Sequence, residues 1–188
     1  FGGTGLDARL ITDLSKLAPD RLMTPNSESF VRTECPAAVA QHRGPWRVRT
    51  SGLLGREGSL TGDELLNSAR PMGAHVCECS GNNNPANFGL MSVAEWDGVP
   101  LADVLSRLEV ARNATAVLVA GVDHETQKSG SSIAGASWVM PLASLDRLGA
   151  FLAVRMNREP LPLDHGRPVR LVVPGWYAPT WIKWVDEI

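Results

Sequence analysis

The chain has 188 residues and a formal net charge of −2, with 44% hydrophobic and 20% charged residues. This length suits one domain with a substantial core, and the composition is that of an ordinary globular protein. The small net charge gives no argument for a basic nucleic-acid-binding patch, and no apolar run of about 18 residues is present that could span a membrane.

The first half of the chain predicts short elements separated by turns. Residues 29–36, "SFVRTECP", are extended and stop at a proline. Residues 46–52, "WRVRTSG", alternate apolar and basic side chains, which predicts a strand with its arginines on one face. In "LTGDELL" (60–66), Thr61 and Glu64 stand at capping-box spacing, so we expect a short helix to begin there.

The middle of the chain contains three stronger signals. Residues 73–80, "GAHVCECS", predict a strand that runs into the polar turn "GNNNPAN" (81–87). Residues 98–108, "GVPLADVLSRL", place leucines and valines on one face of a helix. Residues 114–123, "ATAVLVAGVD", form an apolar run that predicts a strand ending at Asp123.

The C-terminal part continues the alternation of strands and short helices. Residues 139–148, "VMPLASLDRL", predict a strand that passes into a helix, and "FLAVRMN" (151–157) leads into the turn "NREP". Residues 168–176 and 181–188 predict two more strands. The sum is six or seven strands with short helices, a mixed α+β fold whose irregular loops carry the function.

Three cysteines, Cys35, Cys77 and Cys79, leave at least one thiol unpaired. A bridge between Cys77 and Cys79 is disfavoured, since their Cα atoms on a strand lie roughly 6.5–7 Å apart. Zinc is also disfavoured, because Cys-x-Cys lacks the usual spacing and a partner pair. Two readings stay open for Cys79: an ordinary buried thiol beside His75 and Cys77, or a thiolate at a strand end where loops build a pocket.

A cluster of charges, "DHGRPVR", occupies residues 164–170. Such clusters are usually solvated, but Arg170 falls on a strand that looks buried. A buried arginine needs an anionic partner, which could be Asp164, Glu159 or a phosphate held by two hydrogen bonds.

Lys183 lies between Trp181 and Trp184. On the same strand face as Trp181 it could extend along the apolar surface to reach water, or it could hold an anion. Six tryptophans are many for this length, so we expect most of them in the core and a few at the rim of a pocket.

Several stretches together resemble the molybdopterin-binding domain of the sulfite oxidase family, in the same order and over nearly the whole chain. The resemblance implies a β-rich fold of the sulfite oxidase type and one domain over residues 1–188. It also implies that the immunoglobulin-like dimerisation domain of many members is absent. The similar stretches are "TPNSESFVR" (24–32), "CSGN" (79–82), "SVAEWDGVPLADVL" (92–105), "GVD" (121–123) and "PLPLDHGRPVRLVVPGWYAPTWIKW" (160–184).

The resemblance implies a mononuclear molybdenum–molybdopterin cofactor. The cysteine of the Cys-x-Gly-Asn motif ligates molybdenum in this family, which points to Cys79, and a soft thiolate suits such a centre. Arg32 would lie near the metal in a catalytic role and also touch the pterin. The cofactor-binding residues that the resemblance implies are Phe30, Arg32, Asp123, His165, Arg170 and Lys183.

The sequence departs from the sulfite-oxidising members at three places. Glu34 stands where they have a histidine, Asn84 where they have an arginine that binds the anionic substrate, and Ala136 or Ser137 where they have a tyrosine. The expected pocket, with Asn84, Trp96 and Trp138, is therefore more apolar than theirs.

We therefore expect an oxidoreductase that transfers an oxygen atom to or from a small, sulfur-containing substrate. A sulfoxide-type reductase and a catalytically degenerate cofactor-binding or partner module stay open. No haem-binding motif is present, so we expect electrons to leave through an acceptor protein such as a cytochrome. A homodimer is also open. Because the chain begins at Phe1 without a signal peptide, we expect a mature or trimmed product, periplasmic or otherwise exported if bacterial.

Overall fold

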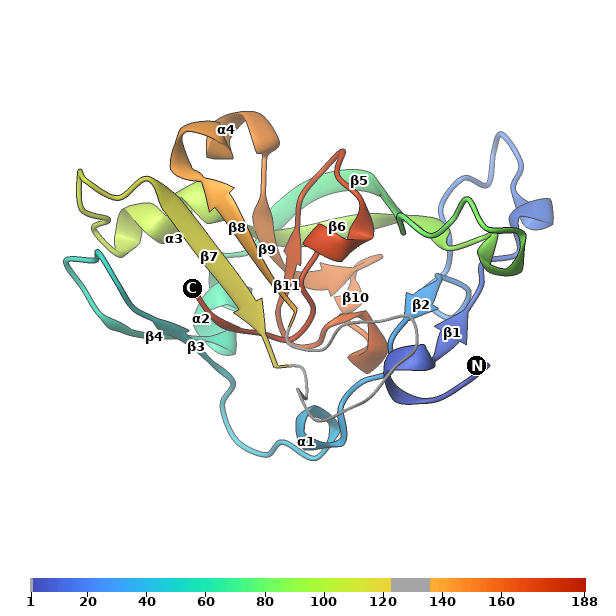
Figure 1. The fold of residues 1–188 in the computed structure, drawn as a ribbon, viewed down its shortest axis with the longest axis horizontal. Helices are drawn as coiled ribbons and strands as arrows, with labels where there is room; N and C mark the ends of the chain where they lie inside the picture. Colours follow the sequence, from blue (N-terminus) through green and yellow to red (C-terminus); the bar gives the residue numbers. More distant parts are fainter. Residues whose placement is uncertain (1, 123–135) are drawn as a thin grey trace.

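A computed structural model describes residues 2–122 and 136–188. The described chain forms two five-stranded sheets, a separate two-stranded ladder and short helices at their edges (Figure 1). The helices are α1 (Ala37–Ala40), α2 (Gly62–Ser68), α3 (Leu101–Arg107) and α4 (Leu145–Leu148), and the 3₁₀ turns are η1 (Gly5–Asp7), η2 (Leu14–Lys16), η3 (Pro85–Asn87), η4 (Leu142–Ser144), η5 (Leu163–His165) and η6 (Ala178–Thr180).

The first sheet is antiparallel and has the order β10-β9-β6-β5, with β11 paired to β9. Its long strands β5 and β6 pair along most of their length, so the end of β5 is held firmly where the loop with Cys79 begins. The strands are β5 (Arg70–Glu78), β6 (Met91–Pro100), β9 (Phe151–Met156), β10 (Glu159–Pro160) and β11 (Arg170–Val172).

The second sheet has the order β4-β3-β12-β7-β8. The C-terminal strand β12 is inserted between β3, to which it is parallel, and β7, to which it is antiparallel. Because β12 is the central strand of this sheet, the segment that precedes β12 is held close to the sheet. The strands are β3 (Arg47–Thr50), β4 (Gly58–Thr61), β7 (Ala116–Gly121), β8 (Ser137–Pro141) and β12 (Val185–Glu187).

The two-stranded ladder joins β1 (Arg9–Leu10) to β2 (Val31–Arg32) in antiparallel register. It lies at one end of the molecule, far from β4 and α3 (Figure 1). One contiguous cluster of buried apolar side chains connects the two large sheets and supplies the main hydrophobic stabilisation. From the first sheet it includes Phe151, Leu152 and Leu171, and from the second Val48, Val119 and Val185.

The α+β fold is confirmed, and so is the capping box. The Thr61 hydroxyl accepts a bond from the Glu64 amide at 3.1 Å, while the Glu64 carboxylate accepts from the Thr61 amide at 2.6 Å. The expected count of six or seven strands is wrong, because the described residues contain twelve, several of them only two or three residues long. The three cysteines are free, which agrees with the expectation that Cys77 and Cys79 are not bridged.

Two element predictions need correction. Strand β6 (Met91–Pro100) was not expected, although its buried and part-buried residues alternate as in a half-buried strand. The predicted strand over 181–188 exists only at its end, since 181–184 are irregular and Trp184 has a φ of 52°. Among the helices of the described residues, none is long and apolar enough to cross a membrane.

Candidate functional site

A cavity of about 650 Å³ opens between the β1–β2 ladder, the loop that follows β5, and the segments around η5 and η6. This volume is typical of small-molecule and cofactor sites. Segments far apart in the sequence therefore meet at one place. The predicted site residues that line this cavity are Phe30, Arg32, Cys79, Trp138, His165, Arg170 and Lys183.

Cys79 is the residue that directly follows β5, and its side chain is partly exposed. Its amide donates to the Leu90 carbonyl at 2.9 Å, which anchors it to the other end of the loop. The thiol lies in the cavity wall, whereas the thiol of Cys77 is buried and burial raises its pKa to about 11. Of these two cysteines, only Cys79 can present sulfur to a ligand in the cavity.

Asn82 holds the loop that carries Cys79. Its buried side-chain oxygen accepts from the amides of Gly89 and Leu90, both at 2.9 Å, and its Nδ2 donates to Glu78 Oε1 at 3.0 Å. The asparagine of the Cys-x-Gly-Asn motif therefore has a structural role, because its side chain joins the two ends of the loop that carries the thiol.

We predict that Asn82→Ala destabilises the protein by about 2 kcal/mol, because two buried amides lose their acceptor. Chemical denaturation would measure this loss. Asn83→Ala, at an exposed neighbouring position, is the control and should change the free energy of unfolding by less than about 0.5 kcal/mol. Equal stability of the two variants would show that Asn82 does not hold the loop.

Arg32 lies on β2, and its Nη1 donates to the Leu6 carbonyl at 2.7 Å. Burial lowers the pKa of the Arg32 guanidinium, the nearby charge of Arg9 lowers it further, and the proximity of Cys79 and Asp7 opposes the shift. Glu34 does not line the cavity. Its carboxylate instead accepts from the Gly5 amide at 2.9 Å, so the glutamate at the expected histidine position supports the η1 turn.

Arg170 is buried, with its guanidinium carbon 5.7 Å from the ring centroids of both Trp96 and Trp181. Its Nη1 donates to the His165 carbonyl at 3.2 Å and its Nη2 to Cys77 Sγ at 3.7 Å, while Nε has no hydrogen-bond partner among the residues that the structure describes. The sequence suggested Asp164 or Glu159 as its anion, but within the described residues no carboxylate is in ion-pair range. An anionic ligand remains as the candidate partner.

Lys183 fastens three segments together. Its ammonium donates to the carbonyls of Arg32, Thr33 and Asp164 at 3.1, 2.7 and 2.9 Å, and lies 4.2 Å from the Trp184 ring centroid. Lys183 lines the cavity, so its positive charge lies at the cavity wall, and its hydrogen bonds fix the backbone segments that form this wall. The backbone needs space here as well: a Cβ on Gly166, whose φ is +107°, would lie 3.2 Å from Lys183 Cα.

His165 is buried, and burial lowers its pKa from 6.5 to about 3, helped by the charges of Arg170 and Lys183. The imidazole is therefore neutral at ordinary pH. A neutral ring offers one donor and one acceptor, which suits a polar heterocycle better than a phosphate.

The lowered pKa of His165 predicts how the free energy of unfolding depends on pH. Below about pH 6.5 the unfolded chain binds a proton that the folded protein refuses, so stability is lost as pH falls from 6.5 towards 3. We predict a shallower loss for His165→Asn over this interval, measured by urea denaturation between pH 4 and 7. His42→Asn, at an exposed position, should keep the wild-type slope. An unchanged slope in His165→Asn would contradict the assignment.

Two predicted pocket residues lie elsewhere. Asn84 is exposed, and its side chain accepts a hydrogen bond from the Ala86 amide at 2.9 Å, which caps η3. Asn87, and not Asn84, lines the cavity. Trp96 is buried behind Arg170 rather than in the wall. Asp123 falls outside the described residues.

Trp138 stands at the cavity wall, partly exposed, and packs edge-on against Trp176 with ring centroids 6.1 Å apart. Ala136 and Ser137, which stand where the family has a tyrosine, also line the cavity. Sequence reasoning missed Arg9, which lines the cavity from β1. No signal in the sequence identified it, because its place depends on the pairing of β1 with β2.

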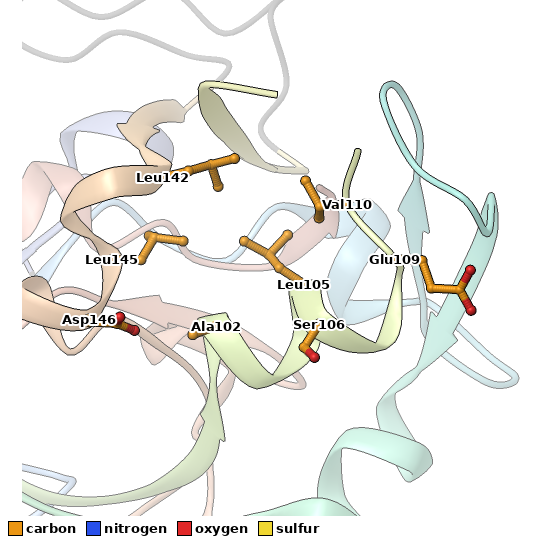
Figure 2. A pocket seen from close by; sticks show the side chains of 8 residues that line it. All are labelled: Ala102, Leu105, Ser106, Glu109, Val110, Leu142, Leu145 and Asp146. Atoms are coloured by element: carbon orange, nitrogen blue, oxygen red, sulfur yellow. The ribbon is translucent and has the colours of Figure 1, made fainter. Parts of the chain in front are cut away.

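A second hollow of about 390 Å³ lies between α3 and the η4–α4 segment. Figure 2 shows Leu105, Val110, Leu142 and Leu145 around it, with carboxylates only at its edges. Because its lining contains no cation and no sulfur, it does not suit an anionic metal cofactor. Across the described residues, no group of three histidine, cysteine or acidic side chains forms a conventional metal site either.

The comparison with known proteins identifies the family. The model of the oxidoreductase molybdopterin binding domain matches residues 34–188. The chain belongs to this family. It is 30% identical over 188 residues to human mitochondrial sulfite oxidase, covering 92% of this chain and 34% of that protein. It is 30% identical over 191 residues to spinach (Spinacia oleracea) nitrate reductase (NADH), covering 93% of this chain and 20% of that protein.

A solved structure of the same kind supports the fold. The sulfane dehydrogenase SoxCD of Paracoccus pantotrophus matches with a TM-score of 0.71 and 22% identity, over 97% of this chain and 50% of that one. The sulfite oxidase type of fold is therefore confirmed. The chain spans a fifth to a third of the length of the two curated relatives named above.

The residues of the cavity fit the cofactor that the family implies. Cys79 offers a soft sulfur donor, and the wall carries the cationic side chains of Arg9, Arg32, Arg170 and Lys183. Asp164 also lines the cavity, but its carboxylate accepts from the Cys35 amide at 2.7 Å. A buried guanidinium with an unsatisfied Nε, in a cavity of this size, is what an anionic phosphate-bearing ligand would complete.

Proposed function

We propose that this chain is a molybdopterin-dependent oxidoreductase that transfers an oxygen atom to or from a small, sulfur-containing substrate. The observation that carries the proposal is the thiol of Cys79 in the wall of a cavity rich in cations, a cavity that buried Arg170 also lines without a carboxylate in ion-pair range among the described residues. When bound, the cofactor supplies a molybdenum centre that changes oxidation state as oxygen moves.

Different residues of the cavity would hold the metal, the phosphate, the pterin and the substrate. The Cys79 thiolate would ligate the metal, and the loop tied by Asn82 fixes its direction. Arg170 and Lys183 would neutralise the phosphate, while neutral His165 would bond the polar pterin. Arg32, close enough to Cys79 for their charges to interact, would orient and polarise the substrate oxygen.

The test is a dye-linked assay in both directions on protein from a host that makes the cofactor. We expect about one molybdenum per chain by mass spectrometry. With sulfite as donor, we expect reduction of an acceptor dye. Absence of molybdenum from a folded sample would reject the proposal and favour the degenerate partner module.

A second candidate, a sulfoxide-type reductase, is favoured by the aromatic side of the cavity. Trp138 lines the cavity and is supported from behind by Trp176, so its ring offers an apolar edge that would accept the alkyl groups of a neutral sulfoxide. Turnover of a sulfoxide with a reduced dye, without oxidation of sulfite, would select this alternative. In either direction we propose that electrons pass through an external acceptor or donor protein.

A further inference from the structure

The tight turn between β9 and β10 places an asparagine in the left-handed region of the backbone. Asn157 and Arg158 are its two central residues, with φ angles of 52° and 67°, and Met156 pairs directly with Glu159. Asparagine is common in such a two-residue hairpin turn, because both central positions need a positive φ. The two side chains differ: that of Asn157 is half-buried, whereas that of Arg158 is 84% exposed.

The side-chain amide of Asn157 makes three hydrogen bonds to segments far away in the sequence. Its Oδ1 accepts from the Glu95 amide on β6 at 3.0 Å, and its Nδ2 donates to the Thr24 carbonyl and to Asn26 Oδ1, both at 2.9 Å. Asn26 in turn donates from its Nδ2 to the Met156 carbonyl at 3.1 Å. The two asparagines therefore join the N-terminal part of the chain to β6 and to the β9–β10 turn.

The segment held in this way runs directly into the wall of the main cavity. Thr24 is buried, donates from its amide to the Val93 carbonyl at 2.8 Å and accepts from the Val93 amide with its hydroxyl at 3.1 Å. Ser29, also buried, donates to two carbonyls of its own segment at 3.1 and 3.4 Å. Phe30 follows directly and Arg32 two residues later, and both line the cavity. This part of the wall is therefore fixed from outside the cavity.

The same pair of asparagines also reaches the wall at His165. Burial lowers the pKa of His165, and the backbone of Asn26 lies within hydrogen-bonding reach of the ring and opposes that lowering. Neither Asn157 nor Asn26 lines the cavity. Their effect on a ligand there passes through the residues of the wall.

We propose that Asn157 is a positioning residue for the main cavity, which acts through Asn26 and the segment 24–29. Its side chain fixes the chain just before β2, and with it the places of Phe30 and Arg32 in the wall. The effect of Asn157 on turnover rests on the proposed function, whereas its effect on the cavity wall rests on the hydrogen bonds alone.

Asn157→Gly separates the side chain from the turn. Glycine adopts the positive φ without strain, so the hairpin should form while the three side-chain bonds are lost. Arg158→Gly is the matched control: it changes the other central position, carries a similar cost in backbone entropy, and removes only an exposed ion pair with Glu95. Asn26→Ala is the second variant, because it leaves the turn intact and cuts the link between the asparagines.

Cofactor-free protein supplies the first two measurements. We expect the imidazole NMR signal of His165, assigned with His165→Asn, to move in Asn157→Gly and in Asn26→Ala. We expect the amides of residues 29–32 to exchange with deuterium roughly tenfold faster in both variants, as the loss of one or two hydrogen bonds allows. The amides of β3 and β4, in the second sheet, should keep their wild-type rates.

The loaded enzyme supplies the third measurement. A small misplacement of a group that orients the substrate costs rate, so kcat for sulfite in Asn157→Gly should fall about tenfold or more while KM changes less. Arg158→Gly should keep the wild-type signal of His165, the wild-type exchange rates and the wild-type kcat.

The outcomes distinguish positioning from simple stabilisation. An unchanged His165 signal with wild-type exchange at 29–32 in Asn157→Gly would overturn the inference, and so would equal changes in Arg158→Gly. Faster exchange spread evenly over both sheets would show that Asn157 only stabilises the fold. An active enzyme whose kcat is unchanged in Asn157→Gly would also reject the positioning role. If the local changes appear but the wild type holds no molybdenum and oxidises nothing, the proposed function fails while the positioning of the wall stands.

Discussion

Cys79→Ser is expected to yield a folded protein without molybdenum and with activity lowered more than about a hundredfold, since even residues that only support metal ligands cost 10- to 100-fold. A serine hydroxyl is a poor replacement for a thiolate at a soft metal centre. The fold should survive, because the Cys79 side chain is partly exposed and its anchoring bond to Leu90 comes from the backbone amide. Metal content by mass spectrometry and a thermal melt measure the two results.

The matched control is Cys35→Ser, a free thiol that does not line the cavity. Burial, with the nearby Asp164 charge, raises its pKa to about 11, so it is not a thiolate at ordinary pH. This variant should keep both molybdenum and activity. Full turnover in Cys79→Ser would remove the ligand assignment, and equal metal loss in both variants would point to a general defect in folding.

How far the sequence predicted this site depends on how each residue is placed. Cys79, His165, Arg170 and Lys183 lie in contiguous motifs, and the structure brings them to one cavity. Arg9 is placed by strands only two residues long, whose pairing joins segments that no local pattern connects. Long-range pairing of this kind is beyond periodicity and turn signals.

Other differences have local physical causes. A run of three asparagines, 82–84, does not reveal which one is buried. In the structure, Asn82 is buried, whereas the Asn84 side chain is exposed and accepts a hydrogen bond from the Ala86 amide in the η3 turn. Strand β6 was missed because residues 98–108 were assigned to a helix, whereas the strand continues past Gly98 with a bulge and the helix begins only at Leu101. The strand expected over 181–188 fails at 181–184, where the irregular backbone turns the Lys183 ammonium onto three carbonyls.

Arg170→Met is expected to separate stability from cofactor binding. In cofactor-free protein, the variant should be as stable as the wild type or more stable by about 1–3 kcal/mol, since burying a charge without a carboxylate is costly. Burial lowers the pKa of Arg170, which reflects the same cost. In the cofactor-producing host, the variant should lose most of its molybdenum. Denaturation of the cofactor-free protein and metal analysis of the loaded protein measure the two effects.

Methionine keeps the bulk of the buried side chain and removes its charge and its hydrogen-bond donors. Methionine approximates the arginine stem, so the space between Trp96 and Trp181 remains filled. It removes the donors to the His165 carbonyl and Cys77, and with them the unsatisfied Nε.

Arg155→Met on β9, where the side chain is exposed, is the control and should change neither stability nor metal content appreciably. A cofactor-free Arg170→Met that is destabilised by more than about 2 kcal/mol would show that the guanidinium supports the fold itself. If Arg170→Met has wild-type stability when cofactor-free and also keeps its molybdenum when made in the cofactor-producing host, the anion of Arg170 is not the cofactor. The expected pair of results would identify Arg170 as a charge kept for its ligand at the expense of the empty protein.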